Sequence, residues 1–287
     1  MTRGFDNLSA INNDLKLCLR FREGTGTITH DWAKPHHSHT LHGPPVWQQL
    51  AGELVTMDFD AGNPDWLDCS AADTADLNFT DEDFSVSAWV YLDDLSNFRM
   101  VLCRGTMWPG DGWFFYVSFN GAIALATCQA GAWQFTLSAA SEIPTNEWHL
   151  ISAARSGASV RIYKDGVDVT SNVGTHVNPA TCNRELHVGI YHDEVQFPFH
   201  GMMWEPRVWA RDVCAAQWYE LYQMGAEFFK GNITTTSTSS STSLTTSTTL
   251  STSTSSSTST TTTLSTSTSL TTSTTLSTST SVSTSST

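Results

Sequence analysis

The sequence predicts an all-β fold, a sandwich or barrel of antiparallel strands, and three features support this prediction. Residues 84–92 alternate with a period of two, with apolar side chains at every even position and serine, tryptophan or tyrosine at the odd ones. Further short apolar segments follow at short intervals with turn residues between them, as in β-sandwiches. Asp165 and Gly166 separate two such segments and give the strongest hairpin signal in the chain.

The elements follow in order along the chain. Residues 15–21 alternate leucine or phenylalanine with polar residues and predict a first strand, which ends at a turn around Gly24 and Gly26. Later strands are expected at 54–59, 66–69, 84–92, 99–103, 113–119, 122–127, 133–137, 148–155, 159–164, 186–191 and 202–209. One helix is expected over 213–224, with Asp212 as N-cap and Gly225 as its stop, over one end of the sandwich.

The two faces of the strand at 84–92 differ in chemistry. Its apolar face would pack in a dry core between two sheets, whereas its second face carries two hydroxyl groups and two aromatic rings. We expect this second face to line a surface that is grooved or partly covered.

A histidine-rich segment follows the first strand and holds half of the ten histidines: His30, His36, His37, His39 and His42. Metal binding would need these side chains in a fixed geometry, but the segment contains three prolines and shows neither helical nor strand periodicity. A solvated loop is the preferred interpretation.

Composition limits the partners of this protein. The chain has 287 residues and a formal charge of −14, and every charged residue precedes Gly231, so the globular part has about 230 residues. Nucleic acid and anionic membranes need clusters of Lys and Arg, which are absent. No run of about 18 apolar residues could span a bilayer, and residues 1–10 lack the apolar run of a signal peptide, so we expect a mature or truncated start.

Cysteines and glycosylation sequons favour an extracellular, secreted or cell-surface protein. Six cysteines are spread along the chain without a Cys-x-x-Cys pair, which favours three disulfides over zinc. Three sequons predict N-glycosylation at Asn7, Asn78 and Asn232.

Several motifs, in order, carry a family resemblance. They are residues 57–60 with Gly62, residues 66–67, 83–89, 147–149 and 163–166, and the Phe199, His200, Gly201 triplet. This set resembles the laminin G-like jelly roll of the concanavalin A-like lectin/glucanase superfamily, over about residues 15–222. The resemblance implies a jelly-roll sandwich of two curved sheets with six or seven strands each. Members bind glycans, bind proteins, hydrolyse β-glucans or act as spacers, so the fold alone does not give the function.

The resemblance also suggests disulfide pairs. First and last strands are often neighbours in this fold, which favours Cys18 with Cys214. Strands one hairpin apart suggest Cys103 with Cys128, which leaves Cys69 with Cys182.

Catalysis is not expected, so the chain is interpreted as a non-enzyme. The hydrolases of the superfamily carry two or three carboxylates at alternate positions of one strand, because retaining hydrolysis needs two carboxyl groups on one face. This chain lacks that motif, and its acidic runs at 81–83 and 193–194 are interpreted as solvated turn charges. Apart from a possible calcium ion, no cofactor is expected.

Calcium is the one metal that the resemblance implies. Asp31 occupies the place of a calcium ligand in the loop after the first strand, and Glu205 that of a second ligand. Trp204 replaces the carboxylate that often accompanies the second ligand, and calcium needs six to eight oxygens, so these two residues alone do not complete a site.

Aromatic side chains are the candidates for binding glycans. A sugar-binding groove needs aromatic platforms with polar neighbours, and the candidates are Trp89, Tyr91, Trp108, Trp113, Tyr116 and Trp133. The same rings could fill the core or bury against a neighbouring molecule, and the sequence leaves these three alternatives open.

The chain ends in a low-complexity tail. Residues 232–287 follow a laminin G-like domain at 1–231 with its core at 15–224, and 48 of the 54 residues from Thr234 are Ser or Thr. Mucin-like composition predicts O-glycosylation of Ser and Thr in 234–287, for example at Thr245, Thr246, Thr266 and Thr271.

The six remaining tail residues are aliphatic and evenly spaced. Their intervals of 6, 14, 6, 6 and 6 place them on one side of an extended strand. Ordering the tail alone costs on the order of 50 kcal/mol, more than six buried aliphatic side chains return. We therefore expect copies of the chain to order it through the assembly residues Leu244, Leu250, Leu264, Leu270, Leu276 and Val282.

Two functions remain open at this stage. The leading hypothesis is a secreted structural glycoprotein that assembles with copies of itself into an extracellular fibre or surface coat. The alternative is a carbohydrate-binding lectin or adhesin on a mucin-like stalk.

Overall fold

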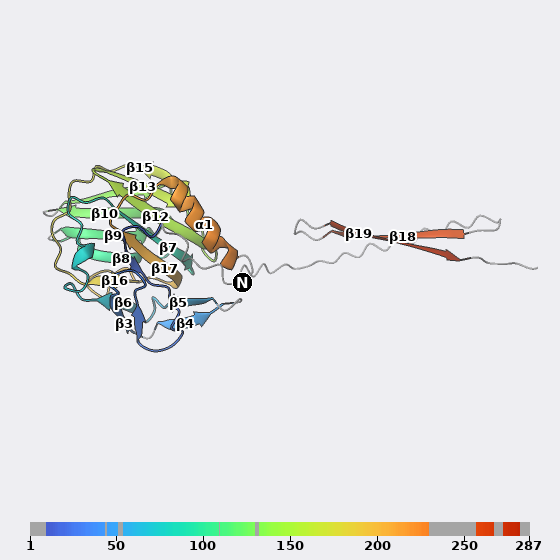
Figure 1. Ribbon diagram of the computed structural model, residues 1–287, viewed down its shortest axis with the longest axis horizontal. Coiled ribbons are helices and arrows are strands. Elements are labelled where there is room, and N and C mark those ends of the chain that lie inside the picture. Colours follow the sequence, from blue (N-terminus) through green and yellow to red (C-terminus); the bar gives the residue numbers. More distant parts are fainter. Residues whose placement is uncertain are drawn as a thin grey trace, which may run out of the picture. The chain divides into compact units, whose positions relative to one another are not determined.

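The computed structural model describes residues 10–43, 45–50, 54–108, 110–129 and 132–229, together with the backbone of Ser257–Thr266 and Thr272–Ser281. It contains a β-sandwich of two antiparallel sheets with one helix, α1 (Ala215–Phe229), as the sequence predicts. Figure 1 shows the sandwich with α1 against it. The chain divides into two units, residues 1–233 and 234–287.

The strand predicted at 84–92 forms β7 (Phe84–Leu92), which lies between two other nine-residue strands in the middle of one sheet. This sheet has eight strands, one or two more than expected. Their order is β14 (Val167–Asp168), β13 (Ser159–Lys164), β12 (Trp148–Ser156), β7, β17 (Gly201–Trp209), β5 (Val55–Phe59) and β4 (Val46–Gln49), and β1 (Leu15–Cys18) pairs with β17.

The second sheet has nine strands, again more than expected. Their order is β15 (Thr170–Asn172), β11 (Ala132–Ser138), β10 (Ile123–Gln129), β9 (Asp111–Val117), β8 (Arg99–Thr106), β16 (Leu186–Val188), β6 (Trp66–Cys69), β3 (Ser38–His42) and β2 (Ile28–His30). A short 3₁₀ helix, η2 (Ala75–Leu77), follows β6. The hairpin predicted at Asp165 and Gly166 joins β13 to β14, and both residues have positive φ angles of 51° and 79°.

The core lies between the two sheets, as the alternation in β7 predicts. Phe84, Val86, Ala88, Val90 and Leu92 all lie in one buried apolar cluster with the inner faces of β8, β9 and β10. The second face of β7 is covered, as expected, because Ser85 accepts a hydrogen bond from the backbone N–H of Val213, the residue two positions before α1.

Helix α1 runs past its predicted stop and covers the outer face of the eight-stranded sheet rather than one end of the sandwich. Trp218, Leu221 and Phe229 are buried in a second apolar cluster with Trp89 and Trp209. The prediction that Gly225 ends the helix is wrong.

Close packing explains Gly225. A Cβ atom at this position would lie 2.4 Å from Nε1 of Trp89, so only glycine lets the helix approach the indole.

The histidine-rich segment is not the solvated loop that we expected. Its ends lie in β2 and β3, His36 and His37 lie between these two paired strands, and His37 and His39 are buried. The sequence does not show the polar and apolar alternation of a strand here, because the buried residues of β2 and β3, Thr29 and His39, are themselves polar.

The predicted disulfides are absent, since all six cysteines are free in this structure. Cys103 in β8 and Cys128 in β10 are separated by the intervening strand β9, so their Cα atoms lie about two strand spacings, or about 10 Å, apart. A bridge needs Cα atoms within about 7 Å, so this pairing is wrong.

The other two pairs also lack support from the topology. Cys18 is buried opposite Arg207 in the β1–β17 pair, whereas Cys214 is exposed directly before α1. Cys69 lies opposite Leu186 in the β6–β16 pair, and Cys182 lies four residues before that partner.

The described tail backbone forms a hairpin of its own. β18 (Ser257–Thr266) pairs antiparallel with β19 (Thr272–Ser281), with Leu264 opposite Thr274 and Thr262 opposite Leu276. These two segments are extended, as predicted, but they pair within one chain. Of the expected assembly residues, Leu244, Leu250, Leu270 and Val282 lie outside the described residues.

Candidate functional site

The outer face of the nine-stranded sheet, directed away from the core, carries a cluster of aromatic side chains. Strand β9 is apolar on both faces: Trp113 and Phe115 point into the core, while Phe114 and Tyr116 point outward. The outward cluster consists of Met100, Cys103, Phe114, Tyr116, Ala124, Ala126, Cys128 and Tyr191, with Phe98, Met107, Phe135, Leu137 and Phe197 packed against it.

A difference in side-chain size shapes this surface. Strand β10 contributes only Ala124, Ala126 and Cys128 to the outer face, and it lies between β9 and β11. Its neighbours carry large rings, because Phe114 and Phe135 both stand opposite Ala126. The small side chains of this central strand are fully buried in the cluster, between strands that carry large rings.

A pocket of about 140 Å³ is lined by members of this aromatic cluster. Its wall residues come from β8, β9, β11 and three adjoining turns, and they are Phe98, Met100, Met107, Phe114, Tyr116, Trp133 and Phe197. The rings hold each other at edge-to-face angles, since the Phe98 centroid lies 5.2 Å from that of Phe197 and 5.7 Å from that of Tyr116. The pocket is therefore built of rings that support one another.

Trp133 gives the pocket an accessible rim. Its side chain is 42% exposed and packs on Phe135, with ring centroids 5.0 Å apart. Tyr116, the other glycan-binding candidate in the pocket wall, is only 5% exposed. Burial, with a smaller contribution from Cys128, raises the pKa of Tyr116 to about 12, so its hydroxyl stays neutral.

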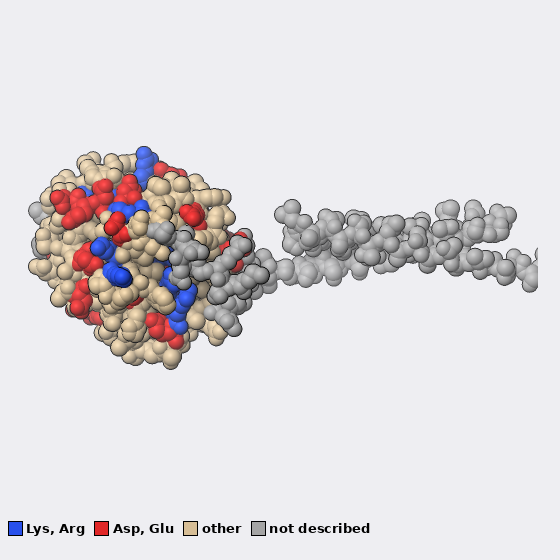
Figure 2. Space-filling view, viewed as in Figure 1, with Lys and Arg blue, Asp and Glu red and all other residues tan. Residues whose placement is uncertain are grey.

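Charge is absent from the pocket wall. None of the seven wall residues is acidic or basic. The molecule as a whole carries a formal charge of −14, and Figure 2 shows one of its faces, on which acidic side chains gather in several patches with basic side chains between them. Any ligand of the pocket would thus meet an uncharged wall on an acidic protein.

The six aromatic candidates from the sequence separate into three groups. Tyr116 and Trp133 line the pocket, and Trp108 follows the wall residue Met107 and is 74% exposed. Trp113 is a core residue, whose indole N–H donates to the backbone oxygen of Leu77 at 2.9 Å. The prediction for Trp113 is therefore wrong, because its place in β9 turns it inward.

The remaining two candidates belong to the other sheet. Trp89 is buried beneath α1 and stacks on Tyr222 with a centroid distance of 5.7 Å. Tyr91 is half-buried beside Trp148, its partner on the neighbouring strand β12. The structure does not bring either ring to the pocket.

Five residues of the pocket wall were not among the candidates from the sequence: Phe98, Met100, Met107, Phe114 and Phe197. One sequence signal points to this region, namely the small residues Ala124, Ala126 and Cys128 at alternate positions, which share one face of a strand. Phe197 lies about a hundred residues from Phe98, and only the fold brings them together.

The expected calcium ligands are both engaged with protein groups. Oδ1 of Asp31 accepts the backbone N–H groups of Cys18 and Ala33 at 2.7 and 2.8 Å, and its Oδ2 lies 3.0 Å from Nδ1 of His37. Glu205 pairs with Arg207, and Nε of Arg20 lies 3.7 Å away. Since cationic side chains surround Glu205, these residues do not fit a calcium site.

One of the three predicted N-glycosylation sites can be described. Asn78 is half-buried, and its Oδ1 accepts the backbone N–H of Cys182 at 2.8 Å. Asn7 and Asn232 lie outside the described residues, as do Thr245, Thr246 and Thr271 in the tail. Glycosylation stays a prediction at all of these positions, and at Thr266 in β18.

Comparison with known protein families gives a match over the sandwich. The sequence model of the concanavalin A-like lectin/glucanases superfamily, in its Laminin_G_3 form, matches residues 69–217. This range is a little more than half of the chain and includes every strand that forms the pocket wall. A comparison with curated protein sequences gives no match.

Solved structures show the same fold at low sequence identity. A botulinum neurotoxin type C structure, described with its dependence on two ganglioside molecules for cell entry, aligns with TM-score 0.58 and 13% identity, over 76% of this chain and 53% of that one. The binding domain of botulinum neurotoxin DC in complex with SialylT aligns with TM-score 0.57 and 11% identity, over 75% and 52%. The chain thus spans about half the length of these structures.

Proposed function

The chain belongs to the concanavalin A-like lectin/glucanases superfamily, and from that premise we propose that it is a lectin-like carbohydrate-binding module. The observation that carries the proposal is the aromatic pocket with the exposed ring of Trp133 at its rim. Aromatic faces pack against the apolar face of a sugar ring, and the polar tips of Tyr and Trp can reach its hydroxyl groups. Neurotoxin domains of the same fold, described with gangliosides and SialylT, lend support.

The size of the pocket limits what enters it. A cavity of about 150 Å³ takes one benzene-sized ring, so a pocket of about 140 Å³ takes one ring or one acetamido methyl group rather than a long glycan. The rest of the glycan would lie over the sheet surface beside Trp133. We therefore expect recognition of a terminal sugar.

Charge decides the class of sugar. An uncharged wall offers no Lys or Arg to pair with a carboxylate, and the charge of −14 repels anionic ligands. A buried carboxylate without a partner costs several kcal/mol or more, on the order of what a small pocket returns. Neutral glycans, including N-acetylated ones, should bind in preference to sialylated ones.

The remaining parts of the proposal follow from the sequence. The chain lacks the paired strand carboxylates of the superfamily's hydrolases, so we propose a binding module rather than an enzyme. An extracellular or cell-surface location with a glycosylated tail fits a lectin of this kind. Among the described residues, the only α-helix is too short and too polar to cross a membrane.

A glycan array tests this proposal directly. The full chain, fluorescently labelled, is applied to neutral and sialylated glycans in parallel at physiological ionic strength. We expect binding to neutral glycans with a common terminal sugar, and at least about tenfold weaker signal when the same glycan is sialylated. Absence of binding at millimolar free ligand, or preference for the sialylated forms, would contradict the proposal.

Assembly into a fibre or surface coat stays a separate hypothesis. It rests on the even spacing of the tail leucines, and nothing in the described part of the chain supports it beyond the extended backbone of β18 and β19. Analytical ultracentrifugation of the full chain and of residues 1–231 compares their masses. If each protein has the mass of its own monomer at all concentrations, the hypothesis is excluded.

A further inference from the structure

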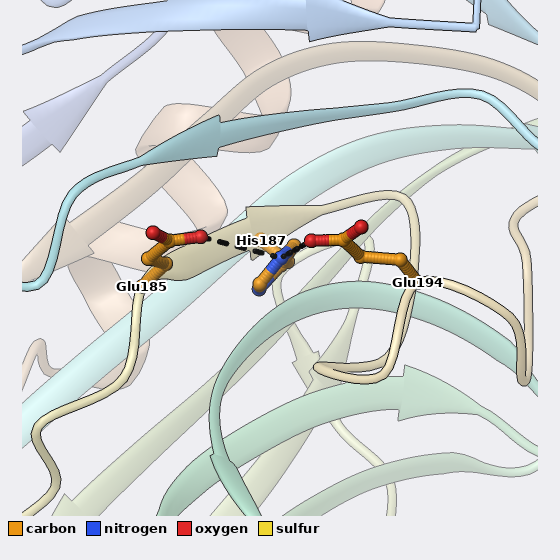
Figure 3. Close-up of side chains that lie close together, drawn as sticks. All are labelled: Glu185, His187 and Glu194. Atoms are coloured by element: carbon orange, nitrogen blue, oxygen red, sulfur yellow. Dashed lines mark ion pairs between the residues drawn. The ribbon is translucent and has the colours of Figure 1, made fainter.

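A buried histidine and two carboxylates meet on the outer face of the nine-stranded sheet, apart from the pocket wall. His187 lies in β16, whose neighbours Leu186 and Val188 point into the core, so the imidazole points outward. Glu185 comes directly before the strand, and Glu194 comes from the turn that follows it. Figure 3 shows the two carboxylates directed at His187 from opposite sides.

Both ring nitrogens of His187 are buried polar atoms without a hydrogen bond in the described part of the chain. It is only 3% exposed, and neither ring nitrogen has a hydrogen-bond partner among the described residues. Its Nε2 lies 3.5 Å from Oε1 of Glu194 and 4.0 Å from Oε2 of Glu185, which is too far for a good hydrogen bond. A buried imidazole left in this state costs free energy, so the arrangement indicates a missing ligand.

The distances fit a metal ion better than a proton. Zinc binds imidazole nitrogen and carboxylate oxygen at about 2.0 to 2.2 Å, so two ligand atoms of a tetrahedral site lie about 3.4 Å apart. The three ligand atoms here lie within 4.8 Å of one another, and Nε2 of His187 lies 3.5 and 4.0 Å from the two carboxylate oxygens. One N–H on Nε2 could serve only one carboxylate, whereas a cation between them serves all three groups.

The backbone on both sides of the cluster is fixed. Arg104 donates from Nη1 to the backbone oxygen of Arg184 at 2.9 Å, directly before Glu185. The N–H of Glu194 donates to the oxygen of Tyr191 at 3.0 Å, so its turn is closed. The two glutamate side chains are themselves exposed and can close the remaining distance by rotation.

We infer that Glu185, His187 and Glu194 bind one divalent transition metal ion of the zinc type. One imidazole nitrogen and two carboxylate oxygens match the nitrogen and oxygen ligands that zinc accepts, and they leave a fourth position for water. Calcium is disfavoured because it needs six to eight oxygen ligands. The inference does not depend on the proposed glycan binding.

This site would stabilise one wall of the pocket. Glu194 and the wall residue Phe197 belong to the same short segment between β16 and β17, and the N–H of Tyr191 donates to Gln196 across it. A metal that ties Glu194 to β16 therefore restricts the segment that carries Phe197.

Isothermal titration of zinc chloride into the chelator-treated full chain tests the site without any carbohydrate. The test variant is Glu185→Gln with Glu194→Gln, since both side chains are exposed and the fold should persist. The control is Glu147→Gln, because Glu147 also lies 3.5 Å from a histidine Nε2, that of His149, whose Nδ1 already pairs with Asp165 at 2.8 Å.

We expect one equivalent of zinc bound by the parent and by Glu147→Gln, and at least about tenfold weaker binding by the double variant. Cobalt(II) in place of zinc should give the strong visible absorption of a tetrahedral site in the parent and in Glu147→Gln, but not in the double variant. The inference is overturned if the parent binds no stoichiometric zinc, if the double variant binds as tightly as the parent, or if calcium binds more tightly than zinc.

Discussion

At the scale of single residues, His37 and His39 in the region after the first strand differ in pKa because their neighbours differ. His37 is 4% exposed and lies between Asp31 and Asp76, with Nε2 3.3 Å from Oδ1 of Asp76. Burial alone would lower the pKa of His37, but hydrogen bonds to Asp31 and Asp76 and the charges of both raise it to about 9. Its neighbour His39 has no such partner, and burial lowers its pKa to about 3.

His37 makes stability depend on pH in a defined direction. Because its pKa is raised on folding, the protonated form stabilises the folded state fully below pH 6.5, and this contribution is lost as pH rises through about 9. The free energy of unfolding should therefore fall by up to about 3 kcal/mol over this window.

Urea unfolding at pH 6.5 and at pH 9.5 measures this fall, and His37→Gln is the test variant. Its free energy of unfolding should change much less between the two pH values than that of the parent, whatever its absolute stability. An equal fall in both proteins would show that other groups cause the pH dependence.

At the scale of elements, helix α1 depends on one close contact with the eight-stranded sheet. Gly225 packs against the Trp89 indole, and a Cβ there would lie 2.4 Å from Nε1. In an exposed helix, Gly→Ala stabilises by about 1 kcal/mol, because alanine has the higher helix propensity. Here overpacking should reverse the sign, and Gly225→Ala should destabilise by about 1 to 3 kcal/mol.

Denaturant unfolding compares this variant with the parent, and the exposed position Ala216 supplies a control within the same helix. Ala216→Gly should lower stability by no more than about 1 kcal/mol, through propensity alone. A gain in stability on Gly225→Ala would contradict the packing of α1 on Trp89.

The elements also show what alternation can and cannot predict. In β7 the two faces differ, with serines on one and only apolar residues on the other, so both the strand and its register follow from the sequence. Strand β9 is apolar on both faces, and its sequence DGWFFYV gives no register. Because of this ambiguity the sequence leaves Trp113 open as a groove candidate, although the residue lies in the core.

The candidate sites depend on contacts that local patterns do not contain. Glu194 reads as a solvated turn charge, and His187 as one polar residue in a short strand, until the fold places them together. The pocket likewise joins Phe98 to Phe197 across the sheet order β9, β8, β16. The sequence predicts the sandwich and includes Tyr116 and Trp133 among its candidate residues. It does not predict the other five wall residues of the pocket, which come together only in the fold.

At the scale of the whole molecule, the protein is an acidic β-sandwich with an uncharged aromatic pocket on its nine-stranded sheet. Helix α1 covers the outer face of the other sheet. The central claim is that glycans bind at the pocket and not elsewhere on the surface.

Titration of the full chain with the best neutral glycan from the array, with Trp133→Ala and Trp32→Ala as matched variants, tests this claim most directly. Trp32 is as exposed as Trp133, at 49% against 42%, but it packs under Arg20, away from the pocket wall. Loss of the rim ring in Trp133→Ala should raise the Kd at least about tenfold, or about 1.4 kcal/mol, and Trp32→Ala should leave it unchanged. An unchanged Kd for Trp133→Ala, in a protein that unfolds like the parent, would contradict the account.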